Sequence, residues 1–247
     1  MAHDPASLDA AFKVLTGFDW GSDAAQLATI DQTIITAHGD DTFRSEIEKR
    51  LLAILSADAP QAATEYACRK LCLVGSVASV PVLATMLGKK ETSHLARVAL
   101  ERIESPEAAA ALRTGLESLE GDVRIGIIGS LGSRQDSASV SSLQRLLTAD
   151  PRTAAAAAVA LGSIRSPEAL AALESCDPLA GEGVGKSVVD ARLRCAEHLL
   201  AQGKRDKAIA AYDVLLKAVT GKQGCRWIEL AAMRGRLSCL DSVAVGS

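Results

Sequence analysis

Five leucines recur along this chain at nearly constant spacing, and the spacing restricts the folds that the chain can adopt. They are Leu71, Leu100, Leu131, Leu161 and Leu200. The successive gaps are 29, 31, 30 and 39 residues. Twelve positions after each leucine stands a second large side chain, at Leu83, Leu112, Leu143, Leu173 and Tyr212. A register kept over about 30 residues is typical of repeat arrays, which grow by adding units rather than by enlarging one core.

Each unit of the register predicts a pair of helices. Ala67, Leu71 and Val74 fall at i, i+4 and i+7, on one face of a helix. Val80 and Leu83 begin a second apolar stripe after a short turn, so the two stripes predict an αα-hairpin. A lone hairpin of this size buries too little apolar surface to offset the conformational entropy that it loses on folding. We therefore expect neighbouring hairpins to stack and to share one core.

The pattern divides the chain into four predicted parts of one continuous solenoid. Residues 1–64 are helical but degenerate in register, and they predict an N-terminal cap. Residues 65–177 hold the regular repeats, and residues 178–187 are rich in glycine and predict a loop. Residues 188–240 predict a C-terminal helical hairpin followed by a capping helix.

The last predicted helix is amphipathic. Its apolar face is marked by Trp227, Leu230 and Leu237, which recur at helical spacing. We expect the residues after Leu240 to be loose, because short terminal segments are ordered only when other parts of the chain hold them.

The charge of the chain is acidic overall and unevenly placed. A net charge of −3 and an aromatic content of 3% argue against a dedicated nucleic-acid-binding protein. Residues 1–64 hold 4 basic and 10 acidic residues, whereas residues 186–236 hold 11 basic and 5 acidic residues. Either this is the ordinary variation of a solvated surface, or the basic end meets an acidic partner.

Targeting and membrane signals are weak in this sequence. No stretch approaches the roughly 20 apolar residues that span a bilayer, and the opening Met-Ala-His-Asp-Pro lacks the apolar core of a signal peptide. We expect a cytoplasmic protein that does not bind membranes. Its six scattered cysteines are then expected to be reduced, small core residues.

Three sequence segments resemble parts of HEAT repeats. Residues 73–87 look like the turn and second helix of that family, and Leu-Gly-Ser at 131–133 and 161–163 fits the same turn. The period near 30 is similar to the short bacterial HEAT-like repeats, including those named after bilin lyases. The resemblance implies an all-α, right-handed α-solenoid of stacked antiparallel helix pairs, with second helices on a concave, partner-binding side. Residues 196–216 also look like a tetratricopeptide-type hairpin.

Residues that would support catalysis or metal binding are sparse. HEAT-like metal hydroxylases use His-Glu pairs as iron ligands, and this chain has only the reverse pair Glu197-His198. Residues 185–187 match the end of a phosphate-binding loop, but Ala180 stands where that motif needs its first glycine. The histidines are His3, His38, His94 and His198. Only Cys195 lies near one of them on a helical face, so we expect no catalytic, cofactor-binding or metal-binding residues.

The strongest functional candidates are polar positions on the second helices, thirteen or fourteen residues after each leucine. They are Arg113, Gln144, Arg145, Glu174 and Asp213. We expect these side chains to contact a protein partner, which predicts a non-enzymatic scaffold or adaptor. Two alternatives stay open: an accessory protein like the bilin lyases that binds a tetrapyrrole or another small ligand, and a domain whose catalytic neighbour lies elsewhere. The oligomeric state is not predicted.

Overall fold

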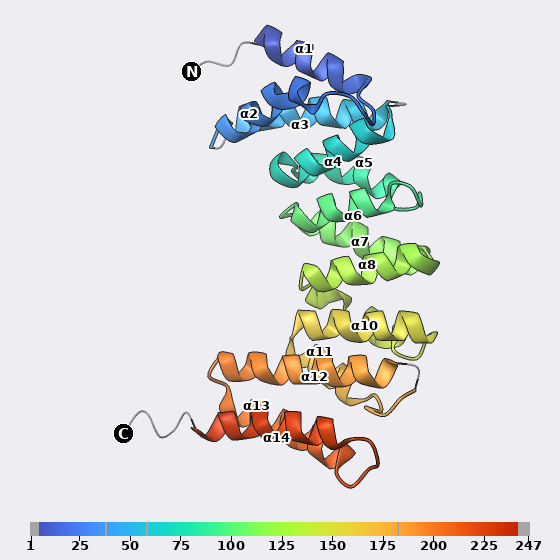
Figure 1. Ribbon diagram of the computed structural model, residues 1–247, viewed down its shortest axis with the longest axis vertical. Coiled ribbons are helices and arrows are strands. Elements are labelled where there is room, and N and C mark those ends of the chain that lie inside the picture. The colour runs from blue at the N-terminus through green and yellow to red at the C-terminus, as the bar shows by residue number, and fades with distance from the viewer. Residues whose placement is uncertain (1–4, 38, 58, 182, 242–247) are drawn as a thin grey trace. The chain divides into compact units, whose positions relative to one another are not determined.

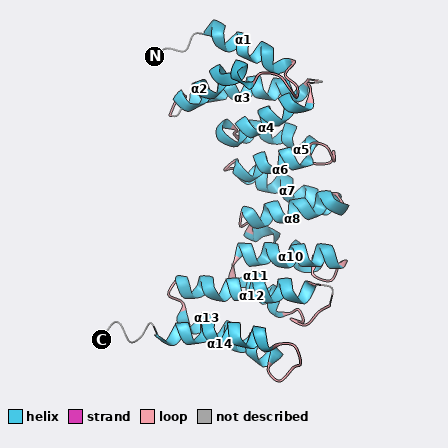
Figure 2. Ribbon diagram, viewed as in Figure 1, coloured by secondary structure: helices cyan, strands magenta, loops and turns pink. Residues whose placement is uncertain are grey.

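A computed structural model describes residues 5–37, 39–57, 59–181 and 183–241. Within these residues the regular secondary structure is entirely helical, with fourteen α-helices and three short 3₁₀ helices (Figure 2). The all-α prediction is therefore confirmed. Successive helices pack on one another as in an α-solenoid, while the right-handed twist stays a prediction. The chain divides into two compact units, residues 1–126 and 127–247, called here the first and second units.

The first unit begins with a helical N-terminal region and continues with stacked helix pairs (Figure 1). Its elements are α1 (Pro5–Thr16), η1 (Ala24–Leu27), α2 (Ala28–Thr36), α3 (Asp41–Ser56), α4 (Gln61–Val74), η2 (Val77–Ser79), α5 (Val80–Met86), α6 (Ser93–Arg102) and α7 (Pro106–Ser118). Helix α4 packs against α3 and α6, and α5 packs against α6 and α7. The first helices of successive pairs, α4 and α6, therefore contact each other, and so do the second helices, α5 and α7.

The second unit repeats this arrangement. Helix α8 (Gly121–Ser133) spans the boundary between the units. The remaining elements are η3 (Ser137–Ser139), α9 (Val140–Leu146), α10 (Pro151–Ile164), α11 (Pro167–Glu174), α12 (Val184–Ala201), α13 (Arg205–Val219) and α14 (Arg226–Asp241). The first helices α10 and α12 pack together, α9 packs against α11, and α14 packs against α12 and α13.

The predicted helix ends follow from local chemistry. Helix α4 ends at Val74, and Gly75 donates its N–H to the carbonyl of Leu71 at 2.8 Å. A Cβ at position 75 would lie 2.5 Å from that carbonyl oxygen, so the turn requires glycine. In the Ser-Pro-Glu segments, Ser105 and Ser166 cap α7 and α11 by accepting backbone N–H donors three residues later.

Four of the five leucine anchors are fully buried, and the fifth is half-buried. The side chains of Leu71, Leu100, Leu131 and Leu161 are fully buried. Leu200 is half-buried and packs against the core beside Ala196 and Leu199. Twelve residues after it, Tyr212 is buried in α13.

The glycine-rich segment is shorter than the predicted loop of residues 178–187. Helix α12 already begins at Val184, so Gly185 lies in its first turn. The missing side chain of Gly185 lets the carbonyls of Pro178 and Ala180 approach within 2.7 and 2.6 Å of the Cβ position. The loop therefore folds closely over the start of α12. The predicted domain boundaries and the tetratricopeptide likeness of residues 196–216 stay predictions.

Candidate functional site

The predicted partner contacts all lie on second helices. Arg113 lies in α7, Gln144 and Arg145 in α9, Glu174 at the end of α11, and Asp213 in α13. Gln144, Arg145 and Asp213 are exposed, whereas Arg113 and Glu174 are half-buried. The leucine register thus placed each residue on the intended element.

The second unit brings some of these residues onto neighbouring helices. Gln144 and Arg145 lie on α9, and Glu174 is the last residue of α11. These two helices pack against each other. The Arg145 guanidinium donates a hydrogen bond to Ser142 Oγ at 3.0 Å, which holds it along the surface of α9. The second unit therefore carries a mixed-charge strip of polar groups, exposed on α9 and half-buried at the end of α11.

Two of the predicted contacts also interact with arginines inside the second unit. Asp213 Oδ1 accepts a hydrogen bond from Arg236 Nε at 2.7 Å, which joins α13 to α14. Burial lowers the pKa of the Arg192 guanidinium in α12, and the negative charge of Glu174 opposes that shift. Glu174 and Asp213 therefore contribute to the electrostatics of the fold as well as to its surface.

The first unit, which holds Arg113, also contains a hollow that the sequence did not predict. The hollow has a volume of about 350 Å³ and lies between α5 and α7. Ala84 and Thr114, which stand at the same register positions as the predicted contacts, lie in its wall together with Leu87 and Leu119. Its wall is mostly apolar and combines these leucines with small side chains of α5 and α7.

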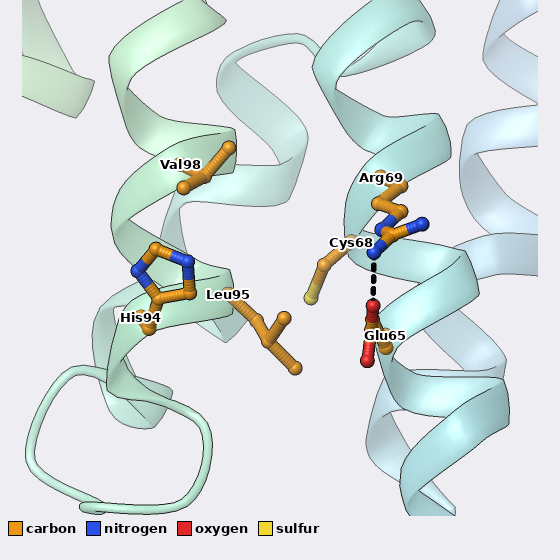
Figure 3. A pocket seen from close by; sticks show the side chains of 6 residues that line it. All are labelled: Glu65, Cys68, Arg69, His94, Leu95 and Val98. Atoms are coloured by element: carbon orange, nitrogen blue, oxygen red, sulfur yellow. Dashed lines mark ion pairs between the residues drawn. The ribbon is translucent and has the colours of Figure 1, made fainter.

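A smaller cavity lies between the first helices α4 and α6 (Figure 3). Its volume is about 160 Å³, and its walls are Glu65, Cys68, Arg69, His94, Leu95 and Val98. Glu65 and Arg69 form an ion pair at its edge, and in the view of Figure 3 the Leu95 side chain lies between Cys68 and His94. Burial raises the pKa of the Cys68 thiol to about 12, with smaller contributions from Cys72 and Glu65. The thiol is therefore protonated at neutral pH and is not an activated nucleophile.

The remaining cysteines and histidines do not assemble into a metal site within the described part of the chain. All six cysteines are free thiols. His198 lies on the same helix as Cys195, but its ring nitrogen Nε2 is 2.8 Å from the side-chain amide of Gln202. His3 and His38 lie outside the described residues.

One buried polar cluster was missed by the sequence pattern. Glu48 in α3 is 3% exposed and accepts hydrogen bonds from the Ser76 N–H at 2.7 Å, from Ser76 Oγ at 2.8 Å and from Ser79 Oγ at 2.5 Å. The carboxylate thereby joins α3 to the turn between α4 and α5. Its donors are 28 and 31 residues away, so no local pattern distinguishes it from the solvated acids of the same helix.

Comparison with known proteins supports the repeat architecture. Residues 114–177, which run from α7 to the loop after α11, match the family model of HEAT repeats. No curated protein matches the chain. None of the described helices is both long and apolar enough to cross a bilayer.

Proposed function

The chain carries HEAT repeats over residues 114–177, and from this premise we propose that it is a non-enzymatic scaffold or adaptor that binds a protein partner. HEAT repeats commonly mediate interactions between proteins. The proposed contact surface is formed by second helices, which the HEAT resemblance implies to lie on a concave side. In the second unit this surface consists of Gln144, Arg145, Glu174 and Asp213. Arg113 lies in the first unit, and we propose it as a separate contact with a partner.

The observation that carries this proposal is the pair of exposed polar side chains on α9, beside the end of α11. Gln144 and Arg145 lie inside the matched HEAT segment and are exposed, although neighbouring Leu143 and Leu147 are buried. Helix α9 contributes a long, adaptable amide and a guanidinium, which together can pair with a carboxylate or a backbone carbonyl of a partner.

The test is capture of partners from the native cell with charge-changed variants. Gln144→Glu combined with Arg145→Glu should reduce recovery of the natural partner at least tenfold, measured by quantitative mass spectrometry. Arg113→Glu is tested separately because it belongs to the first unit. Arg194→Glu is the matched control, since Arg194 is an exposed arginine on the first helix α12. Undiminished recovery with unchanged helicity and melting temperature would contradict the proposal.

The small-ligand alternative gains no support from the described cavity between α4 and α6. Small-molecule sites generally occupy roughly 300–1,000 Å³ and bury most of the ligand surface. The cavity of Figure 3, at about 160 Å³, is too small for a tetrapyrrole.

A further inference from the structure

Helix α14 exposes the apolar face that the sequence marked as its amphipathic stripe. Trp227 is 47% exposed, Leu230 56% and Leu237 55%. Met233 and Leu240 are each 46% exposed. At about 100° per residue, these five side chains fall within about 140° of the helix circumference. We call them the α14 stripe. The predicted capping helix therefore presents an apolar outer surface rather than a polar one.

The opposite side of α14 is the one that joins the core. Ile228, Ala232 and Cys239 are buried against the hairpin of α12 and α13. Gly235 lies against the ring of Tyr212, where an added Cβ would come within 2.3 Å of the ring carbon Cζ. Helix α14 is thus apolar on two nearly opposite sides, and only the side with small residues packs within the unit. A surface helix that needs no partner has one apolar side.

The size of the α14 stripe exceeds what scattered surface side chains explain. Its exposed fractions correspond to an apolar area on the order of 500 Å², near the upper end of the largest patches on monomeric proteins. Two facing surfaces of this size would bury about 1,000 Å², the lower limit for a specific interface. The stripe is therefore large enough to dock one helix.

The charges beside the α14 stripe define the partner. Arg226 and Arg234 are exposed within the same arc of the helix, and within the described residues neither forms an ion pair. Arg236 is paired with Asp213, while Glu229 accepts the Gly221 N–H at 3.0 Å and keeps its negative charge. Among the described residues, the charges along the stripe that have no opposite charge beside them are thus two positive and one negative, a positive balance. This agrees with the surrounding segment, residues 186–236, which holds 11 basic and 5 acidic residues.

The same charges disfavour a second copy of this chain as the occupant. The midpoint of the α14 stripe lies between Met233 and Arg234. An antiparallel pair of α14 helices centred there would bring Arg234 within about one residue of its own copy along the helix axis, and a parallel pair would bring the two copies to the same level by symmetry. Like charges facing each other at the centre of a small interface oppose association.

We propose that the α14 stripe docks an amphipathic helix of another protein, one whose apolar face is flanked by aspartate or glutamate. The leucine, methionine and tryptophan side chains would pack between the apolar side chains of the incoming helix. Arg226 and Arg234 would pair with its flanking carboxylates and would fix its direction. This surface is separate from the polar strip of α9 and α11, so the proposal does not depend on the proposed function.

The test uses two synthetic helical peptides of about five turns that carry the same leucine stripe. One has glutamates beside the stripe, and its matched control has lysines at those positions. Fluorescence anisotropy should show at least tenfold tighter binding of the glutamate peptide by the whole chain. Leu230→Gln combined with Leu237→Gln should weaken this binding at least tenfold. Arg226→Glu combined with Arg234→Glu should reverse the preference between the peptides.

The controls separate this proposal from general stickiness and from the proposed function. Leu73→Gln changes a leucine of α4 that is 61% exposed, and it should leave the affinity unchanged. Gln144→Glu combined with Arg145→Glu should also leave it unchanged. Equal binding of both peptides, or binding that survives Leu230→Gln with Leu237→Gln, would overturn the proposal. A dimer in sedimentation velocity that dissociates on Leu237→Gln would overturn it in favour of a second copy.

Discussion

In the first unit a buried carboxylate joins neighbouring helices, whereas in the second unit glycine lets their backbones touch. Glu48 accepts hydrogen bonds from Ser76 and Ser79 across the interior of the first unit. Gly162 in α10 faces Ala191 in α12, and a Cβ on that glycine would lie 2.7 Å from the Ala191 Cα. The contact of α3 with the turn between α4 and α5 is thus stabilised by directional polar groups, and the contact of α10 with α12 by close packing of small residues.

Each kind of contact occurs a second time in the same unit. In the first unit, Asp31 of α2 accepts a hydrogen bond from the Tyr66 hydroxyl at 2.6 Å and pairs with Lys70 Nζ at 2.6 Å. In the second unit, Gly132 of α8 faces Ala160 of α10, with 2.9 Å between its Cβ position and the Ala160 Cα. We therefore expect that removing a buried carboxylate should destabilise the first unit. Adding a methyl group to a closely packed glycine should destabilise the second unit.

The largest effect is expected from Glu48→Ala. The substitution removes the acceptor of one buried donor, Ser79 Oγ, and of two donors of Ser76, which is exposed and can turn to water. An unmade buried hydrogen bond costs about 1–3 kcal/mol, and more where one partner is charged. We expect the first unit to lose roughly 3 kcal/mol of unfolding free energy. Hydrogen exchange should speed up in α4 and α5 and stay unchanged in α10 and α12.

The matched control is Glu48→Gln, which keeps one acceptor oxygen in the same place. It should cost about 1 kcal/mol, the value of a weakened hydrogen bond. No loss for the glutamine variant beside a large loss for the alanine variant would show that the side chain acts by packing alone, and the contrast between the units would disappear.

A smaller effect is expected from Gly162→Ala in the second unit. The new Cβ would lie 2.6 Å from the Cβ of Ala191, so α10 and α12 must separate. Overpacking of this kind costs about 2 kcal/mol, measured by thermal and denaturant unfolding. Gly129→Ala is the control, because nothing lies within 4 Å of its Cβ position in α8. It should stabilise the helix by up to about 1 kcal/mol, and destabilisation by Gly129→Ala would mean that helix geometry, not close approach, decides.

The regular part of the fold was predictable because its evidence is local. Leu71, Leu100, Leu131 and Leu161 each report burial through their own helix, and the turn after each follows from nearby residues. The HEAT resemblance is confirmed for residues 114–177, while its bilin-lyase type remains a prediction. The same register placed the predicted contacts on second helices, but nothing in it identifies what they bind.

The features that the sequence missed depend on distant parts of the chain. Glu48 meets donors 28 and 31 residues later, so its burial cannot be deduced from its own helix. Helix α14 has two apolar sides, and the bulky residues Trp227, Leu230 and Leu237 dominate any reading of its pattern. The packed side is instead the one with small residues, because Gly235 and its neighbours fit closely against Tyr212.

The smallest expected effect is one in which the two units should behave alike. Burial raises the pKa of Cys68 in the first unit to about 12 and that of Cys195 in the second unit to about 11, from an ordinary value of 9.0. The folded state keeps these thiols protonated while the unfolded state ionises above pH 9. Stability is therefore complete below that pH and falls as the pH rises toward the folded values.

At pH 10 each of the two thiols should account for a loss of about 1.4 kcal/mol relative to neutral pH. Cys68→Ala and Cys195→Ala should each reduce the alkaline loss of unfolding free energy by about this amount, measured by urea unfolding at pH 8 and pH 10. The constant cost of the lost sulfur cancels in this difference. If only Cys68→Ala flattened the pH dependence, the units would differ in how well they exclude water, and the contrast would extend beyond hydrogen bonds and glycine contacts.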